Sequence, residues 1–446
     1  LEGVMDIVLA NLFPQEDYMS SEHMDSRITT LHFPMGLGII AAVLKNAGWP
    51  FSTYDSYVNG TTEGFMKMIQ QKCPDAVLLS GFLGNYSYKF VKDISLKIKS
   101  LNKNTIIIIG GPMASSIPYL LISKTSIDFV VKGEGECTII ELLEAIDINK
   151  SPAKVKGIYY KDTPNRVFFT GERERINNLD DSTFPFYSIF PVNAYVNYLN
   201  ETDRCWEIST SRGCYARCNF CKLTFGQKIT SHSYQYIVDH MIYVSERYGV
   251  NKFSFVDDNF LNTPNHIDNF VTILKALPQK FKWRFQGRAD KLSPAMVEEM
   301  VNVGLYDISF GIESGSQKML NHYGKNLDIM KTFSTLDTIK SMVRIHATFI
   351  VGGPKENWDT IEETKLFIRR LKLNNAGFGI LTLFPGTIFY DEAKKNGLIN
   401  DDDEYCMNLG PVYDRSYVNI SDMSDDDLIE ARDMLVETAA EFGSYM

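Results

Sequence analysis

The sequence predicts an α/β protein with two parallel-sheet domains and a small C-terminal helical region. Apolar runs of strand length alternate with helical periodicity along most of the chain, which is typical of parallel sheets covered on both faces. The alternation stops once, at residues 151–202, and then resumes. We therefore expect a doubly wound, flavodoxin-like (Rossmann-like) domain over 1–150 and a partial (β/α)6 TIM-like barrel over 203–400.

Five short apolar runs are the expected strands of the first domain. They are MDIVLAN (5–11), FSTYD (51–55), DAVLLSG (75–81), TIIIIGG (105–111) and SIDFVVK (126–132). Helical patterns follow at 35–48, near 61–71, at 85–101 and at 137–146. Because helices separate the strands, we expect them to run parallel and to place ligands beyond their carboxyl ends.

The next segment, 151–202, is expected to be a linker on the surface of both domains. It contains a hairpin with its turn at Thr163-Pro164-Asn165, then a connector with proline and aromatic residues. The barrel strands expected after it are CWEISTS, KFSFVDD, FKWRFQG, YDISFGI, RIHATFIV and GFGILTLF. In barrels of this kind the active site lies at the carboxyl ends of the strands. Residues 401–446 are acidic and contain one helix near 424–442. We expect this whole region to pack over an opening or edge of the barrel.

The bulk composition is that of an ordinary globular protein in a reducing compartment. Apolar residues make up 44% and charged residues 22%, and the net charge is −10. An acidic surface repels polyanions, so nucleic acid is not an expected partner. The most apolar run ends at Gly110-Gly111-Pro112, too soon to span a membrane, and the first residues resemble a buried strand rather than a signal peptide. We expect a cytoplasmic protein that does not bind membranes.

Three of the seven cysteines form a cluster, Cys214, Cys218 and Cys221, with the spacing Cys-x3-Cys-x2-Cys. Random placement would produce this triplet roughly 0.002 times in such a chain, so a metal site is favoured. Three thiolates can bind a cubane iron–sulfur cluster and leave one iron open. Zinc is the alternative, and His232 is the near candidate for its fourth ligand. The other four cysteines are expected to be small core residues.

The segment RGCYARCNFC resembles the signature of the radical S-adenosylmethionine (SAM) enzymes, in which the open iron binds the amino and carboxylate groups of SAM. Later strand ends, FVDDNF, QGRAD, GIESGS, FIVGGP and LFPGTIFYDEAKKNGLI, also resemble this family. The first domain resembles the cobalamin-binding domain of one large branch of it. An Asp-x-His-x-x-Gly motif, which supplies a cobalt ligand in other cobalamin proteins, does not follow the first strand.

The resemblance implies two sets of cofactor contacts. Those for SAM are Phe220, Asp257, Asp258, Arg288, Glu313, Ser314, Gly352 and Gly353. Those for cobalamin are Ser80, Gly81, Asn85, Tyr86, Gly110, Gly111, Pro112, Gly133, Glu134, Gly135 and Glu136, with His23 and His32 as histidines able to reach cobalt.

Structural alternatives stand beside several of these assignments. The two aspartates are also suited to capping a helix near Pro264, and Arg288 to a structural salt bridge. The glycine-rich segments are also suited to ordinary tight turns.

The implied function is a cobalamin-dependent radical SAM methyltransferase acting on an unactivated carbon, or less readily on phosphorus, of a small-molecule or peptide substrate. A 5′-deoxyadenosyl radical would remove a substrate hydrogen atom, and methylcobalamin would then deliver the methyl group. An external donor such as flavodoxin or ferredoxin would reduce the [4Fe-4S] cluster. The catalytic residues are not identified by the sequence.

Three other functions remain open at this point. A cyclase or rearrangement enzyme would use the same cofactors without net methyl transfer. Methylthio transfer fits poorly, because the first domain has only Cys73 and Cys137 where such enzymes carry three further cysteines. A non-catalytic cobalamin or redox sensor would not need both sets of motifs.

Overall fold

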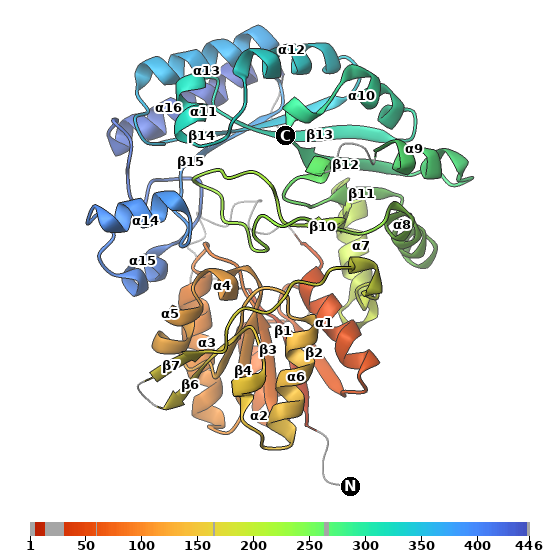
Figure 1. Cartoon of the computed structure of the whole chain (residues 1–446), viewed down its shortest axis with the longest axis vertical. Coiled ribbons are helices and arrows are strands. Elements are labelled where there is room, and N and C mark those ends of the chain that lie inside the picture. The colour runs from red at the N-terminus through yellow and green to blue at the C-terminus, as the bar shows by residue number, and fades with distance from the viewer. Residues whose placement is uncertain (1–4, 14–30, 59, 164–165, 263–266, 444–446) are drawn as a thin grey trace. The chain divides into compact units, whose positions relative to one another are not determined.

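The computed structural model describes residues 5–13, 31–58, 60–163, 166–262 and 267–443, and these form two compact units. The first contains residues 1–201 and 400–411, and the second contains 202–399 and 412–446. Each unit is an α/β structure with a parallel sheet, as the sequence predicts (Figure 1). The domain boundaries differ from the predicted ones in two places. The expected linker belongs to the first unit, and the C-terminal region is divided between the two units.

The first unit is built on a seven-stranded sheet of order β2-β1-β3-β4-β5-β6-β7. The first five strands are parallel, and the β6–β7 hairpin extends the sheet with antiparallel pairing. The turn predicted at Thr163-Pro164-Asn165 lies mostly outside the described residues. The strands are β1 (Ile7–Asn11), β2 (Phe51–Asp55), β3 (Ala76–Ser80), β4 (Ile106–Gly110), β5 (Phe129–Val131), β6 (Ile158–Thr163) and β7 (Arg166–Phe169).

Helices cover both faces of this sheet. The chain moves from β1 outward to β2, and then from β3 to β5 in the opposite direction, so right-handed crossovers place α1 on one face and α2 and α3 on the other. Helix α6 lies on the same face of the sheet as α1 and contacts it (Figure 1). The core on this face includes Leu9, Leu44 and Leu142. The helices are α1 (Met35–Asn46), α2 (Thr62–Lys72), α3 (Ser87–Leu101), α4 (Gly111–Ser116), α5 (Pro118–Lys124), α6 (Glu136–Asp147), α7 (Val192–Glu201) and α15 (Asp402–Asn408).

Two polar contacts explain why segments outside 1–150 belong to this unit. The hydroxyl of Tyr195, on α7, donates to the buried carboxylate of Asp55 at the end of β2. From the acidic run that begins α15, Asp403 pairs with Lys92 of α3, with an N–O distance of 2.8 Å. Residues 401–408 therefore pack on the first unit. The sequence predicts that they pack on the barrel, so this prediction is wrong for residues 401–408.

The second unit contains a six-stranded parallel sheet of order β15-β14-β13-β12-β11-β8, the predicted partial barrel. Its strands are β8 (Trp206–Ile208), β11 (Lys252–Phe255), β12 (Lys282–Gly287), β13 (Leu305–Glu313), β14 (Arg344–Val351) and β15 (Ala376–Ile380). A separate two-stranded ribbon is formed by β9 (Ser211–Arg212) and β10 (Thr230–Ser231).

A helix follows almost every strand of this barrel. They are α8 (Tyr234–Tyr248), α9 (Ile267–Ala276), α10 (Pro294–Val301), α11 (Gln317–His322), α12 (Ile329–Ile339), α13 (Trp358–Leu371), α14 (Ile388–Lys395) and α16 (Asp425–Ala440). The last, α16, contacts β15 and α13, so the predicted C-terminal helix covers the β15 edge of the sheet.

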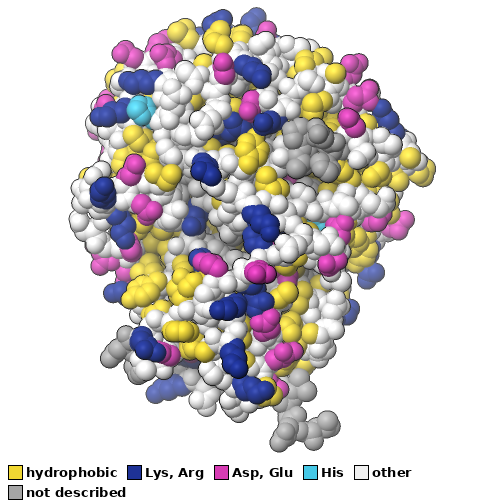
Figure 2. All heavy atoms as spheres, in the orientation of Figure 1, with side chains coloured by type: hydrophobic (Ala, Val, Ile, Leu, Met, Phe, Trp, Pro, Cys, Tyr) yellow, Lys and Arg dark blue, Asp and Glu magenta, His cyan; other side chains and the backbone are white. Residues whose placement is uncertain are grey.

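The surface carries charges of both signs. On the face seen in Figure 2, Lys and Arg side chains are interspersed with Asp and Glu side chains. No described helix is both long and apolar enough to cross a lipid bilayer.

We expect Tyr195→Phe to destabilise the protein by about 1–3 kcal/mol, because the buried Asp55 carboxylate loses a hydroxyl donor. Chemical denaturation followed by circular dichroism measures this loss. Tyr119→Phe is the matched control, since Tyr119 is 64% exposed and should change stability by less than about 0.5 kcal/mol. Equal stability of the two variants would contradict the assigned role of Tyr195.

Candidate active site

The cysteine loop is closed at its base by the β9–β10 ribbon, which pairs Arg212 with Thr230. Gly213 opens the loop with φ +91°, and a Cβ there would lie 2.3 Å from the carbonyl oxygen of Lys228. Backbone N–H groups of Cys214 and Cys221 donate to Gly226 and Cys218, at 3.2 and 3.1 Å. A glycine and local hydrogen bonds thus hold the three cysteines on one tight turn.

The three thiols form a donor set suited to iron. Burial raises the pKa of the Cys214 and Cys218 thiols, and it raises that of Cys221 to about 12, with Cys218 adding to the effect. Binding of iron must therefore displace protons from them. In the described part of the chain, no three His, Cys, Asp or Glu side chains converge on one point as ligands of a single ion do. A cubane does not require such a point, because each cysteine binds its own iron.

Tyr323 connects the cysteine loop to the rest of the barrel. Its carbonyl oxygen accepts from the Asn219 N–H at 2.8 Å, and its ring meets Phe220 edge-on, with centroids 5.6 Å apart. The side chain is fully buried, and its hydroxyl donates to the Ile350 carbonyl at 3.2 Å. Phe220 is thereby held against the strand end that the Gly352-Gly353 turn follows.

The Gly352-Gly353 turn is shaped by two neighbours. A Cβ on Gly353 would lie 2.2 Å from Cε1 of Tyr323, so only glycine fits there. The carboxylate of Glu356, 1% exposed, accepts from the N–H groups of both glycines, at 2.5 and 3.2 Å. Burial raises the pKa of Glu356 to about 7, while these donors lower it.

Glu313 is the last residue of β13 and Ser314 follows it, but the two side chains have different partners. Glu313 forms a buried ion pair with Lys325, with Oε1 and Nζ 2.7 Å apart. The Ser314 hydroxyl lies 3.1 Å from that of Thr364 and accepts from the Ser316 N–H. Charge on Glu313 raises the pKa of Cys218 and charge on Lys325 lowers it, both after the larger effect of burial, so the pair lies within electrostatic reach of the cysteines.

The two aspartates after β11 also have different surroundings. Asp257 is buried and accepts from the Thr210 and Ser211 N–H groups at 2.7 and 2.6 Å, so its carboxylate ties down the start of the cysteine loop. Burial raises the pKa of Asp257 to about 6. Asp258 is exposed, and its charge raises the pKa of Cys214, after burial. Asp258 therefore lies within electrostatic reach of the cysteines. The helix-capping alternative involves residues 263–266, which lie outside the described residues.

Arg288, at the end of β12, is held by its neighbours. Its guanidinium donates to Asp290 at 3.0 Å and to the carbonyl oxygens of Lys325 and Asn326 at 2.9 and 3.1 Å. These contacts include the salt bridge that the sequence offered as the alternative to binding a cofactor carboxylate.

The first unit has a cavity of about 430 Å³ at the carboxyl ends of β1 and β3. This is the switch point of the doubly wound sheet, where ligands bind in such folds. Four of the sequence-predicted cobalamin contacts line it, namely Ser80, Gly81, Asn85 and Pro112. The side-chain oxygens of Asn85 and Ser87 are buried there without a hydrogen-bond partner among the described residues, which suits a ligand with N–H donors.

The other predicted contacts shape this edge without lining the cavity. Tyr86 starts α3 with φ +57°, and its N–H donates to Leu409. A Cβ on Gly111 would meet the Ser80 hydroxyl at 2.8 Å, and the Gly133 N–H donates to Ser115. Glu134 accepts from the Ile176 N–H at 2.7 Å and so secures the connector. Three further predicted positions are Gly110, the last residue of β4, Gly135, which precedes α6, and Glu136, which begins that helix.

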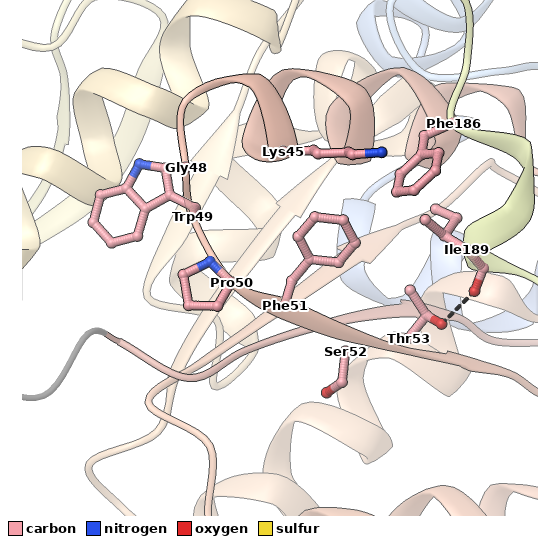
Figure 3. Close-up of a pocket in the computed structure, with 9 residues that line it drawn as sticks. All are labelled: Lys45, Gly48, Trp49, Pro50, Phe51, Ser52, Thr53, Phe186 and Ile189. Atoms are coloured by element: carbon pink, nitrogen blue, oxygen red, sulfur yellow. Dashed lines mark hydrogen bonds between the residues drawn. The ribbon is translucent and has the colours of Figure 1, made fainter.

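His32 lines the cavity, whereas His23 lies outside the described residues. A second hollow, of about 470 Å³, lies where α1 ends and β2 begins, away from the carboxyl edge (Figure 3). Its walls include Trp49, Phe51 and Phe186, with the Lys45 ammonium 3.9 Å from the Phe186 ring centroid.

Comparison with known families matches both units. Residues 208–368 match the radical SAM superfamily, and residues 25–143 match the B12 binding domain. An uncharacterized methyltransferase of Pyrococcus horikoshii is 29% identical over 82% of this chain and 79% of its own length. Cytidylyl-2-hydroxyethylphosphonate methyltransferase of Streptomyces wedmorensis is 25% identical over 92% of this chain and 85% of its own.

One further relative and one solved structure extend this comparison. An anaerobic magnesium-protoporphyrin IX monomethyl ester cyclase of Rubrivivax gelatinosus is 23% identical, over 86% of this chain and 72% of its own. Among solved structures, the cobalamin-dependent radical SAM enzyme OxsB has the same fold, with a TM-score of 0.70 at 19% identity over 99% of this chain. This chain spans 62% of the OxsB chain.

The chain joins a parallel partial barrel with a three-cysteine loop to a doubly wound domain with a cavity at its switch point, which suits an iron–sulfur cluster in one unit and a second cofactor in the other. The chain belongs to the cobalamin-dependent radical SAM enzymes. The cofactors of this family are a [4Fe-4S] cluster and SAM for the barrel, and cobalamin for the first domain.

Sequence reasoning missed Tyr323, Lys325 and Glu356. Glu356 follows the glycine pair by three residues, a spacing that allows a side chain to cap a turn, so a signal for it was present. Tyr323 and Lys325 lie in an ordinary helix-to-loop segment with no motif, and only their burial identifies them.

We expect Gly353→Ala to displace Tyr323 and destabilise the barrel by about 1–3 kcal/mol, because the added methyl group overlaps its ring. Gly377→Ala on β15 is the control, since the nearest atom to its Cβ is 3.7 Å away. Thermal unfolding of the two variants measures the difference. If Gly353→Ala were as stable as Gly377→Ala, the packing described around Tyr323 would be wrong.

The raised pKa of Glu356 predicts a dependence of stability on pH. Between the ordinary value of 4.5 and about 7, the folded chain keeps a proton that the unfolded chain has released. Stability from this group is therefore greatest below pH 4.5 and falls as the pH rises to 7. From about pH 5.5 to about pH 8, the wild type should lose about 2 kcal/mol relative to Glu356→Gln. Denaturant titrations at both pH values measure this difference. An equal change of unfolding free energy in the wild type and in Glu356→Gln would contradict the prediction.

Proposed function

We propose that this chain is a methyltransferase that methylates an unactivated carbon of a small-molecule or peptide substrate. The observation that carries the proposal is the presence of both cofactor domains in one chain that is similar, over 82% and 92% of its length, to two proteins named as methyltransferases. A flavodoxin or ferredoxin is the proposed source of electrons, since the reaction needs a reduced cluster.

When bound, the cluster and SAM supply a 5′-deoxyadenosyl radical, and cobalamin supplies the methyl group. The chain's own residues bind and orient. Cys214, Cys218 and Cys221 hold the iron. Glu313 and Asp258 accept hydrogen bonds from the hydroxyl or ammonium groups of SAM. The Gly352-Gly353 turn permits close approach of the adenine, beside Phe220.

Several of the predicted contacts act indirectly in this proposal. Asp257 orients the cysteine loop through Thr210 and Ser211. Arg288 and Ser314 support the loops around the site through the contacts described above. In the first unit, Asn85 and Ser87 offer acceptors to amide N–H groups of cobalamin. The cavity of about 430 Å³ suits one arm of that cofactor rather than its whole corrin ring.

A cyclase that uses the same cofactors is the second candidate. The observation in its favour is the similarity to an anaerobic cyclase over 86% of this chain. The two functions differ in whether the methyl group of SAM reaches cobalamin.

The deciding experiment loads anaerobically purified, cluster-reconstituted protein with hydroxocobalamin and measures bound cobalamin and iron. We expect one cobalamin and one cluster per chain, with Cys214→Ala losing the cluster but keeping cobalamin, because the cysteines lie in the other unit. Methyl-labelled SAM and a reductant should then label the bound cobalamin. Cobalamin without label would favour the cyclase, and a cluster without cobalamin would refute both.

A further inference from the structure

The ion pair between Lys325 and Glu313 is the most deeply buried charge pair near the cysteines. The two side chains are only 10% and 8% exposed, and Nζ lies 2.7 Å from Oε1. The Lys325 ammonium is also 6.0 Å from the ring centroid of Phe220, the aromatic residue of the cysteine loop. Neither the family signature nor the predicted SAM contacts include Lys325.

The end of β13 is built to admit this pair. The β13–β14 register shifts between Gly311 and Glu313, and Glu313 has a φ of +66°, which is strained for a residue with a side chain. A Cβ on Gly311 would lie 2.4 Å from Oε1 of Glu313 and 2.9 Å from Nζ of Lys325. Glycine at 311 is therefore the condition for the pair to form.

The backbone on the lysine side is also held in place. Arg288 donates to the carbonyl oxygens of Lys325 and Asn326, from the end of the neighbouring strand β12. The lysine therefore approaches Glu313 from a fixed loop, and the carboxylate cannot turn away without leaving a buried ammonium unpaired, which is costly.

The two oxygens of Glu313 have different roles. Oε1 is bound by Lys325, whereas Oε2 has no hydrogen-bond partner among the described residues and is not sealed off from solvent. Lysine has no acceptor, so within this pair the carboxylate receives the hydroxyl or ammonium donors of SAM, and Oε2 is its oxygen with no bond to Lys325.

We propose that Lys325 is a positioning residue that acts through Glu313, holding Oε1 so that Oε2 points at SAM. This inference rests on the proposed SAM site and deepens it. Removing the ammonium frees a buried carboxylate to rotate or to take up a proton, and SAM then loses an oriented acceptor.

Equilibrium binding of SAM to the reconstituted holoenzyme, without reductant, tests the proposal. Lys325→Met and Glu313→Gln should each weaken binding by about 10- to 100-fold. Lys325→Arg should restore most of the affinity. The double variant should bind no more weakly than Glu313→Gln, because both changes remove the same interaction. Iron content and the cluster absorbance should stay unchanged in all four.

Two results would overturn the inference. One is wild-type affinity in Lys325→Met, and the other is additive losses in the double variant, which would mean that Lys325 contacts SAM by itself. Gly311→Ala provides an independent arm, since it should separate the pair and weaken SAM binding to a similar degree, whereas Gly377→Ala should not. Failure of the wild-type holoenzyme to bind SAM would instead refute the proposed function.

Discussion

The candidate SAM site depends on the contacts of one buried residue, Tyr323. Its carbonyl oxygen holds the cysteine loop through Asn219, its ring supports Phe220, and the same ring fills the space above Gly353. Segments that are more than 100 residues apart in sequence are thereby brought to one place. A residue with no direct part in the proposed chemistry thus sets the distances among those that have one.

Both units place their candidate cofactor site at the same position, the carboxyl ends of parallel strands. Parallel strands end together at one edge, so short loops at that edge converge and can present backbone and side-chain groups to a large cofactor. The loops must approach closely, which explains why Gly111, Gly213 and Gly353 have no room for a side chain. Polar groups left unpaired in the first unit and charges paired in the second then give each edge its own chemistry.

Several predicted site residues bind the protein backbone and hold the loops of the site in place. Asp257 binds two backbone N–H groups of the cysteine loop, and Glu134 binds one of the connector. In both cases the carboxylate lies at the end of a strand, as expected, but points at the protein. A strand-end position is predictable from periodicity, whereas the direction of a side chain depends on which N–H groups lie unsatisfied nearby. The same reason explains why the connector, expected on the surface of both domains, packs on the first.

The sequence by itself determined the two α/β units, the strand positions to within a few residues, and the cysteine turn, because these follow from local periodicity and short spacing. FSTYD at 51–55 coincides with β2. Only the tertiary structure decided which charges meet. Lys325 and Glu313 are separated by a helix, and Glu356 acquires its raised pKa from burial rather than from a neighbour in sequence. Burial and long-range pairing depend on how the strands come together, and no short stretch of sequence carries that information.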